Sequence, residues 1–209
     1  MQDRDYKIFR AGEYYHVYNR GNNKQPIFLD TQDYLNFLKR LHLVLGTARV
    51  PLVAVQGAPL RIKPLPANSF TLASYCLMPN HFHFLIRQNT DMAISKLIHK
   101  LCTSYTAYFN NKYNYVGHLF QDQFKAKLVN NDTYFKYLSA YIHNNHSDPL
   151  HYSYSSFQDV IGKRNGVLCD INLVLGMFNN SPEEYKKFVL DFSYTDKKLI
   201  EHLLFEDGQ

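Results

Sequence analysis

The sequence lacks tryptophan, and its 209 residues include only three cysteines. Cys76, Cys102 and Cys169 are too few and too widely spaced for a disulfide framework or a cysteine-based zinc ribbon. No run of about 18 apolar residues is present, so the sequence predicts no membrane span. The first residues lack the basic-then-apolar pattern of a secretory signal, and we therefore expect a cytoplasmic protein. A G-x-x-x-x-G-K-[ST] loop is also missing, which agrees with chemistry that needs no nucleotide cofactor.

Aromatic residues are abundant even though tryptophan is missing, with 17 tyrosines and 15 phenylalanines. Tyrosine rings can stack on nucleobases, and their hydroxyls can bond to phosphates. The formal net charge of +5 also favours a polyanionic partner. Neither property is specific, because many proteins without a nucleic-acid role share them. The composition therefore permits a nucleic-acid partner without requiring one.

Alternation of apolar and polar residues predicts strands, and an apolar period of about 3.6 residues predicts longer helices between them. The expected strands span residues 12–21, 70–77, 81–88 and 124–130. The expected helices span residues 33–46, 91–112 and 131–145. Either Asp30 or Thr31 is a suitable N-cap for the first helix, and either Asn131 or Asp132 for the third.

The order strand, helix, strand, strand, helix, strand is that of a ferredoxin-like split βαβ fold. This fold is of the α+β class, with helices packed on an antiparallel sheet. Proline is frequent between residues 48 and 69, which indicates an extended insertion, with a hairpin expected around residues 56–59. A Ser/Tyr-rich connection and further helical segments follow residue 150. We therefore expect a main domain at residues 1–150 and a helical C-terminal extension at residues 151–209.

Two histidines lie one residue apart in the apolar stretch "YCLMPNHFHFLI", residues 75–86. Since successive side chains of a strand point to opposite faces, His81 and His83 project together, while Phe82 and Phe84 project the other way. Two imidazoles on one rigid face form a bidentate nitrogen site for a divalent cation. The alternative is a pair of surface histidines on the exposed face of an antiparallel sheet.

The third expected helix carries a tyrosine and an asparagine at helical spacing. Asn145 follows Tyr141 by four residues in "YIHNN", and so lies one turn further along the same helical face. Next to the histidine strand, this helix could bring a phenol and an amide oxygen to one cation. His143 is expected to point away, and His146 to lie off this face. In the simpler alternative, Tyr141 packs in the core and Asn145 caps the helix end.

Several blocks of the sequence together resemble one family. They are "YYHVYNRGNNKQPIF", "YCLMPNHFHFLI", "TSYTAYFNNKYNYVGHLFQDQFKAKLV", "YLSAYIHNN" and "YSYSSF". In this order, over roughly residues 13–157, they resemble the single-tyrosine HUH transposases of insertion sequences, especially the REP-associated tyrosine transposases. Several blocks in family order are specific, whereas the histidine pair alone is not. Two positions depart from the family pattern: His146 stands where proline is usual, and Gln123 where a basic residue is common.

The resemblance implies a reaction and its residues. It implies that His81 and His83 bind a metal ion, that Asn145 is the third, polar ligand, and that Tyr141 is the nucleophile. It makes residues 1–150 a catalytic domain that cleaves and rejoins single-stranded, hairpin-forming DNA through a 5′-phosphotyrosine. Two nitrogens and an oxygen suit Mg²⁺ or Mn²⁺, and Zn²⁺ is compatible with these ligand types. A phenol, with an ordinary pKa of about 10, is a weak nucleophile at neutral pH, so a cation that polarises the phosphate would assist it.

Basic and polar residues on three expected elements could contact DNA phosphates. They lie at the end of the first strand, on the polar face of the second helix and on the last strand of the sheet: Arg20, Asn22, Lys24, Lys96, Lys100, Lys125 and Lys127. Each is equally compatible with an ordinary solvated surface, because a phosphate contact needs only a charge within reach. The mixed-sign C-terminal helices are expected to present a solvated face.

Two other functions stay open at this point. A domesticated or non-catalytic single-stranded nucleic-acid-binding protein would use the aromatic residues for stacking alone. A metal-dependent hydrolase of small phosphoesters would activate water in place of Tyr141. The sequence also leaves open whether the protein is a monomer or a homodimer, and thus whether Tyr141 acts in its own subunit or in a partner.

Overall fold

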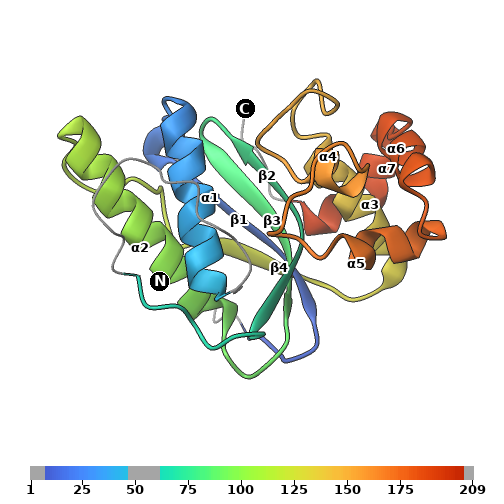
Figure 1. Cartoon of the computed structure of the whole chain (residues 1–209), viewed down its shortest axis with the longest axis horizontal. Helices are drawn as coiled ribbons and strands as arrows, with labels where there is room; N and C mark the ends of the chain where they lie inside the picture. The colour runs from blue at the N-terminus through green and yellow to red at the C-terminus, as the bar shows by residue number, and fades with distance from the viewer. Residues whose placement is uncertain (1–7, 47–61, 205–209) are drawn as a thin grey trace.

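The computed structural model describes residues 8–46 and 62–204, and these residues form an antiparallel sheet with helices on both faces (Figure 1). The sheet has the strand order β2-β3-β1-β4. Its strands are β1 (Tyr14–Arg20), β2 (Phe70–Met78), β3 (His81–Gln88) and β4 (Lys125–Val129). Chain order and spatial order together are those of the ferredoxin-like split βαβ fold. The predicted fold class is confirmed, while the hairpin expected around residues 56–59 lies outside the described residues.

Helices α1 (Thr31–Leu45) and α2 (Ile94–Tyr113) cover one face of the sheet. α1 begins at the expected N-cap Asp30, whose side chain accepts from the Asp33 amide in a reciprocal capping box, and it ends at Gly46 with φ of 67°. Phe82 and Phe84 project from β3 into the core beneath these helices. This face therefore buries the apolar side chains that alternate with the two histidines of β3.

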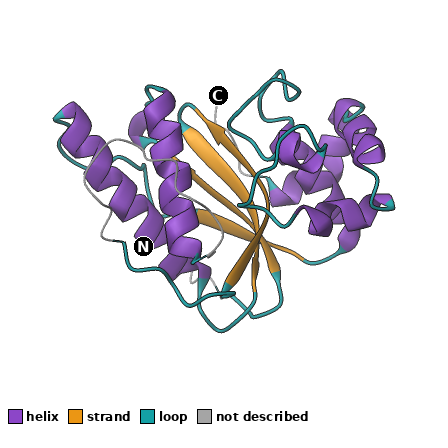
Figure 2. Ribbon diagram, viewed as in Figure 1, coloured by secondary structure: helices purple, strands orange, loops and turns teal. Residues whose placement is uncertain are grey.

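A second group of helices covers the other face of the sheet (Figure 2). The group comprises α3 (Asp132–His143), α4 (Phe157–Val160), α5 (Ile171–Leu175), α6 (Pro182–Leu190) and α7 (Tyr194–Leu199). Short 3₁₀ turns complete the described elements: η1 (Asn22–Lys24), η2 (Gly176–Phe178) and η3 (Glu201–Leu203). None of the helices in the described residues has both the length and the apolar character needed to cross a membrane.

The C-terminal helices share a core with α3. His143 lies at the centre of this core, with one ring nitrogen 2.6 Å from the Tyr185 hydroxyl of α6 and the other 2.8 Å from the Ser156 hydroxyl. Both His143 and Tyr185 are fully buried, and burial lowers the pKa of His143 to about 3. The segment after residue 150 is therefore packed into the molecule as part of the layer that contains α3.

Helix α3 ends earlier than the sequence predicts. It begins at Asn131, one of the two expected caps, whose side chain accepts from the Tyr134 amide at 2.8 Å. Its last helical residue is His143, and the side chain of the C-cap residue Asn144 donates to the carbonyls of Ala140 and Val189. An asparagine amide that satisfies end-of-helix carbonyls favours termination at this point. Residue 145, expected within the helix, therefore lies in the turn that follows it.

Candidate active site

Strands β1 and β3 pair so that their histidines lie on the face covered by α3. In the antiparallel register Tyr18 lies opposite His83, and His16 lies two residues before Tyr18 on the same face. His81 and His83 also share this face, with ring centroids 5.1 Å apart. His81 is 7% exposed, whereas His16 and His83 are fully buried. The structure therefore brings the predicted histidine pair into the interior, beside a third histidine.

The hydrogen bonds of His16 fix the protonation of His83. Nδ1 of His16 lies 2.7 Å from the carbonyl of Leu203, which can only accept, so this nitrogen carries a proton. Nε2 of His16 lies 2.9 Å from Nδ1 of His83. In a neutral His16 ring Nε2 is an acceptor, so Nδ1 of His83 donates to it and Nε2 of His83 keeps a lone pair. That Nε2 atom is buried and has no hydrogen-bond partner.

Burial keeps both of these rings neutral. The pKa of His16 is lowered to about 4, mainly by burial; the hydrogen bond with the Leu203 carbonyl acts in the opposite direction, and the nearby Lys127 ammonium acts in the same direction as burial. Burial also holds the pKa of His83 well below its ordinary value, with His16, His81 and Arg20 acting in the same direction. At neutral pH both imidazoles are therefore in the form that binds metal ions.

His81 is oriented by the turn that precedes β3. Its Nδ1 lies 2.6 Å from Oδ1 of Asn80, and the Asn80 amide nitrogen donates to the Lys24 carbonyl at 3.0 Å. Because an oxygen only accepts, Nδ1 of His81 is the donor and Nε2 carries the lone pair. Nε2 lies 3.1 Å from Oδ1 of Asn145. Two lone pairs that face each other at this distance repel, unless a proton or a cation lies between them.

The side chains of His81, His83 and Asn145 are chemically suited to bind a divalent cation. The predicted ligand set supplies two imidazole nitrogens and one amide oxygen, and the lone pair of His83 Nε2 is buried with nothing to accept from. A buried polar atom without a partner is uncommon, and a cation would satisfy it. Residues 8–46 and 62–204 contain no cluster of three or more His, Cys, Asp or Glu side chains suited to a metal. Any metal centre at His81 and His83 therefore depends on a ligand of another type, such as Asn145.

Tyr141 lies next to this ligand set. Its ring is edge-on to His83 at a centroid distance of 5.9 Å and edge-on to His16 at 6.4 Å. The Lys197 ammonium lies 5.7 Å from the Tyr141 ring centroid. Tyr141 as a whole residue is only 7% exposed, and it belongs to the core on the α3 side of the sheet. Tyr137, one turn earlier, packs instead against Phe188 of α6.

Three of the predicted DNA-contacting residues share the face of the histidines. In the sheet register Arg20 lies opposite His81, while Lys125 and Lys127 lie opposite Tyr18 and His16. Lys125 is exposed, whereas the Lys127 ammonium donates to the carbonyl of Leu204. The face of the sheet that carries the histidines therefore also has basic residues on β1 and β4, an arrangement suited to a phosphate backbone.

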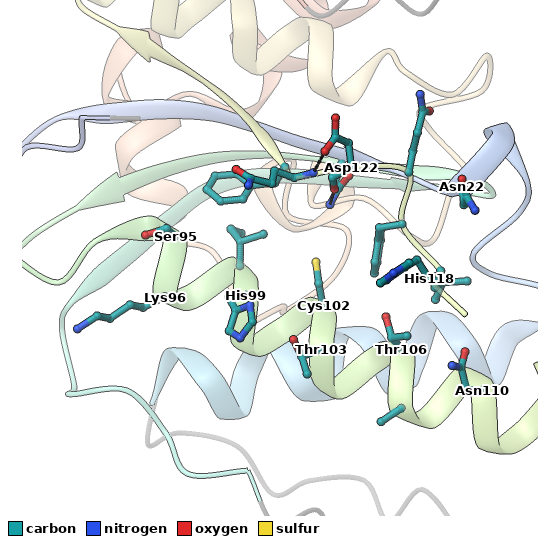
Figure 3. A pocket seen from close by; sticks show the side chains of 18 residues that line it. Asn22, Ser95, Lys96, His99, Cys102, Thr103, Thr106, Asn110, His118 and Asp122 are labelled. Atoms are coloured by element: carbon teal, nitrogen blue, oxygen red, sulfur yellow. Dashed lines mark hydrogen bonds between the residues drawn. The ribbon is translucent and has the colours of Figure 1, made fainter. Parts of the chain in front are cut away.

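The other predicted DNA-contacting residues lie elsewhere. A groove of about 1100 Å³ runs between α2 and the segment before β4, on the α2 side of the sheet. Figure 3 shows Lys96 at one end of this groove and Asn110 at the other, with Asn22 on the facing wall. Lys24 is exposed in η1, and Lys100 is half-buried on α2; neither lines the groove. The predicted set is thus dispersed: three residues lie on the histidine face, two line the groove, and Lys24 and Lys100 belong to neither surface.

Two residues of the site were not predicted from the sequence, His16 and Asn80. The alternation that places His81 and His83 on one face of β3 also places His16 and Tyr18 on one face of β1. This pattern would have identified His16 if the two strands had been considered as neighbours. No comparable signal marks Asn80, because its role depends on the conformation of a two-residue turn.

Comparisons with known proteins agree with this architecture. The model of the IS200-like transposase family matches residues 64–145, the segment that contains the histidine pair, Tyr141 and Asn145. A solved structure of a REP-associated tyrosine transposase bound to a REP hairpin is similar with a TM-score of 0.54 and 14% identity, over 82% of this chain and 90% of that chain. No curated protein sequence matches this chain.

Two further solved structures are similar at a lower level. A protein from Deinococcus radiodurans, assigned as a transposase, has 12% identity and a TM-score of 0.41, over 70% of this chain and 98% of that chain. The tRNA(His) guanylyltransferase from Saccharomyces cerevisiae has 11% identity and a TM-score of 0.42, over 100% of this chain and 85% of that chain.

The predicted resemblance is confirmed by the family match: over residues 64–145 the chain has the sequence pattern of IS200-like transposases. Its fold is similar to that of a REP-associated tyrosine transposase.

Proposed function

We propose that the protein is a metal-dependent DNA strand transferase of the tyrosine HUH type, which cleaves and rejoins single-stranded DNA. The observation that carries the proposal is the buried, unpartnered Nε2 of His83, in a cluster with His81 and Asn145 and beside the ring of Tyr141. With a cation bound to these residues, Tyr141 would be a nucleophile beside the cation site. The family match over the same segment supports the assignment.

In the proposed reaction His81, His83 and Asn145 hold Mg²⁺ or Mn²⁺. When bound, the cation would polarise the scissile phosphate and offset the charge that develops on it. The Tyr141 oxygen attacks phosphorus and gives up its proton, and the bond from phosphorus to the 3′-oxygen breaks. The proton ends on that 3′-oxygen, so one fragment of the strand leaves with a 3′-hydroxyl, while the other fragment stays on Tyr141 as a 5′-phosphotyrosine. Attack by a 3′-hydroxyl on this linkage reverses the step and rejoins DNA without a nucleotide cofactor.

The proposed substrate is single-stranded DNA next to a hairpin. The structurally similar REP-associated transposase is bound to a REP hairpin, and the proposed location of this protein is the cytoplasm. Arg20, Lys125 and Lys127 are proposed to contact the strand near the cation. Asn22, Lys24, Lys96 and Lys100 are proposed to contact more distant phosphates, and the proposed assembly is a monomer or a homodimer.

The test is covalent capture of DNA. Wild-type protein incubated with labelled, hairpin-bearing single strands and Mn²⁺ is expected to form an adduct stable to denaturation. Y141F should abolish the adduct and retain DNA binding, because only the attacking oxygen is removed. Y137F is the matched control, since Tyr137 packs on Phe188, and it should form the adduct. Adduct formation by Y141F would place the nucleophile elsewhere.

The second candidate is a non-catalytic single-stranded nucleic-acid-binding protein. The 7% exposure of Tyr141 is the observation that favours it, because a nucleophile must meet its substrate. This candidate predicts DNA binding without any adduct, unaffected by chelator and by H81A. The strand-transferase proposal predicts that H81A and chelator both abolish the adduct while most of the DNA affinity remains.

A further inference from the structure

The chain contains a buried histidine that none of the proposed catalytic steps uses. His16 is fully buried and connects two distant parts of the sequence. On one side its Nδ1 lies 2.7 Å from the Leu203 carbonyl, and on the other its Nε2 lies 2.9 Å from Nδ1 of His83. The two rings are nearly parallel, with an interplanar angle of 22°.

We infer that His16 is a positioning residue: it holds the proton of His83 on Nδ1 and thereby keeps Nε2 of His83 available for the cation. The inference rests on the proposed metal centre. A carbonyl only accepts, so the Leu203 carbonyl fixes the proton of His16 on Nδ1. A buried neutral ring then presents Nε2 as an acceptor, and only the Nδ1–H tautomer of His83 can donate to it. Without that acceptor, His83 is free to carry its proton on Nε2, where it would block the cation.

Outer residues of this kind set the tautomer and orientation of metal-binding histidines, and their loss typically weakens metal binding about 10–100-fold. The link also reaches the C-terminal segment, since Leu203 follows His16 by 187 residues. A chain that ends before Leu203 would lose the carbonyl that fixes His16. The C-terminal segment thus contributes to the cation site although it supplies none of the proposed ligands.

Two substitutions separate the two hydrogen bonds of His16. An asparagine amide occupies about the place of the histidine Nδ1, so H16N keeps a donor for Leu203 and loses the acceptor for His83. A glutamine amide reaches the place of Nε2, so H16Q keeps the acceptor and loses the donor at Nδ1. We expect Mn²⁺ to bind H16N at least about tenfold more weakly than wild type, and to bind H16Q within about threefold of wild type.

The measurements use the full-length protein with Mn²⁺ alone, and electron paramagnetic resonance counts the free ion. In the metal-free protein, ¹⁵N-histidine spectra, assigned with H83Q, report the tautomer directly. His83 should carry its proton on Nδ1 in wild type and H16Q, and on Nε2 in H16N. A wild-type His83 protonated on Nε2, or equal Mn²⁺ affinity of H16N and H16Q, would overturn the inference. Wild-type protein that binds no Mn²⁺ would instead contradict the proposed metal centre itself. Metal-free melting temperatures identify any variant that is merely unfolded.

Discussion

Asn80 makes two hydrogen bonds whose directions are fixed by chemistry. Its amide nitrogen donates to the Lys24 carbonyl, so its Oδ1 faces His81 and accepts from Nδ1. Replacing Asn80 by alanine removes that acceptor and lets the exchangeable proton move to Nε2, the proposed ligand atom. N80A is therefore expected to weaken Mn²⁺ binding about tenfold, measured by titration with free-ion detection. N80D keeps an acceptor and should bind Mn²⁺ at least as tightly as wild type. Equal weakening in both variants would show that Asn80 acts only on the turn.

Lys125 and Lys96 lie on opposite sides of the sheet and distinguish two paths for DNA. If the strand crosses the histidine face, K125A removes a phosphate contact, and the slope of log affinity against log salt falls by about 0.7–0.9. K96A should lower the slope in the same way if the hairpin occupies the groove next to α2. K39A is the control, because Lys39 lies on α1, on the side of the sheet opposite the histidines, and does not line the groove. It should leave the slope unchanged. Wild-type slopes in both K125A and K96A would contradict both DNA paths.

Helices α1 and α2 are connected by Asp33, a carboxylate whose side chain is fully buried. It accepts from the Leu29 amide at the start of α1 and from Lys112 and Tyr113 at the end of α2. D33N keeps the shape and removes the charge, so the Lys112 ammonium loses a buried partner. We expect the free energy of unfolding in urea to fall by about 2 kcal/mol, less than for a fully buried pair because Lys112 is 23% exposed.

The matched control for Asp33 is the exposed pair of Lys186 and Glu183 on α6. Their charged atoms are 3.5 Å apart, and the Glu183 side chain is 81% exposed, so E183Q should change stability by less than about 0.5 kcal/mol. D33N should also leave Mn²⁺ binding unchanged, since α1 and α2 cover the face opposite the histidines. Equal stability of D33N and wild type would mean that the network at the helix ends contributes nothing.

The elements that the sequence predicted are those with a strong local pattern. Alternation identified β3 and placed His81 and His83 on one face, and the Asp30 cap identified the start of α1. Helix α4 was missed, because four residues are too few to show a helical period. The end of α3 was placed too late, because the amide that terminates the helix bonds to Val189, far along the chain.

The candidate site could be predicted only in part, because some of its contacts join residues that are far apart in the sequence. Tyr141 and Asn145 were identified through spacing and family resemblance, although Asn145 reaches His81 from a turn and not from a helix. The contact of His16 with His83 requires the pairing of β1 with β3, and its contact with Leu203 requires the packing of the C-terminal segment. Neither contact leaves a pattern within a short stretch of sequence. Long-range hydrogen bonds therefore account for most of what the sequence did not predict.

On the scale of the whole molecule, the sheet separates two cores, and the C-terminal helices belong to the second one. That core also contains Leu85 of β3 and Tyr141 of α3, so the sheet, α3 and the extension share buried surface. We therefore expect the described residues to unfold in one cooperative transition. In native-state hydrogen exchange, the most protected amides of β1 and α6 should have opening free energies within about 1 kcal/mol of each other.

Cation binding provides a second test of this cooperativity, because the proposed ligands come from β3 and from the turn after α3. A ligand that binds only the folded state stabilises it by about 2.7 kcal/mol when present at 100 times its dissociation constant. If the molecule unfolds as one unit, Mn²⁺ should raise the opening free energies of β1 and α6 amides by the same amount. H83Q, which lacks a proposed ligand, should show no increase in either element. Protection that rises in β1 and not in α6 would mean that the C-terminal extension opens independently, and residues 1–150 would then be a separate folding unit.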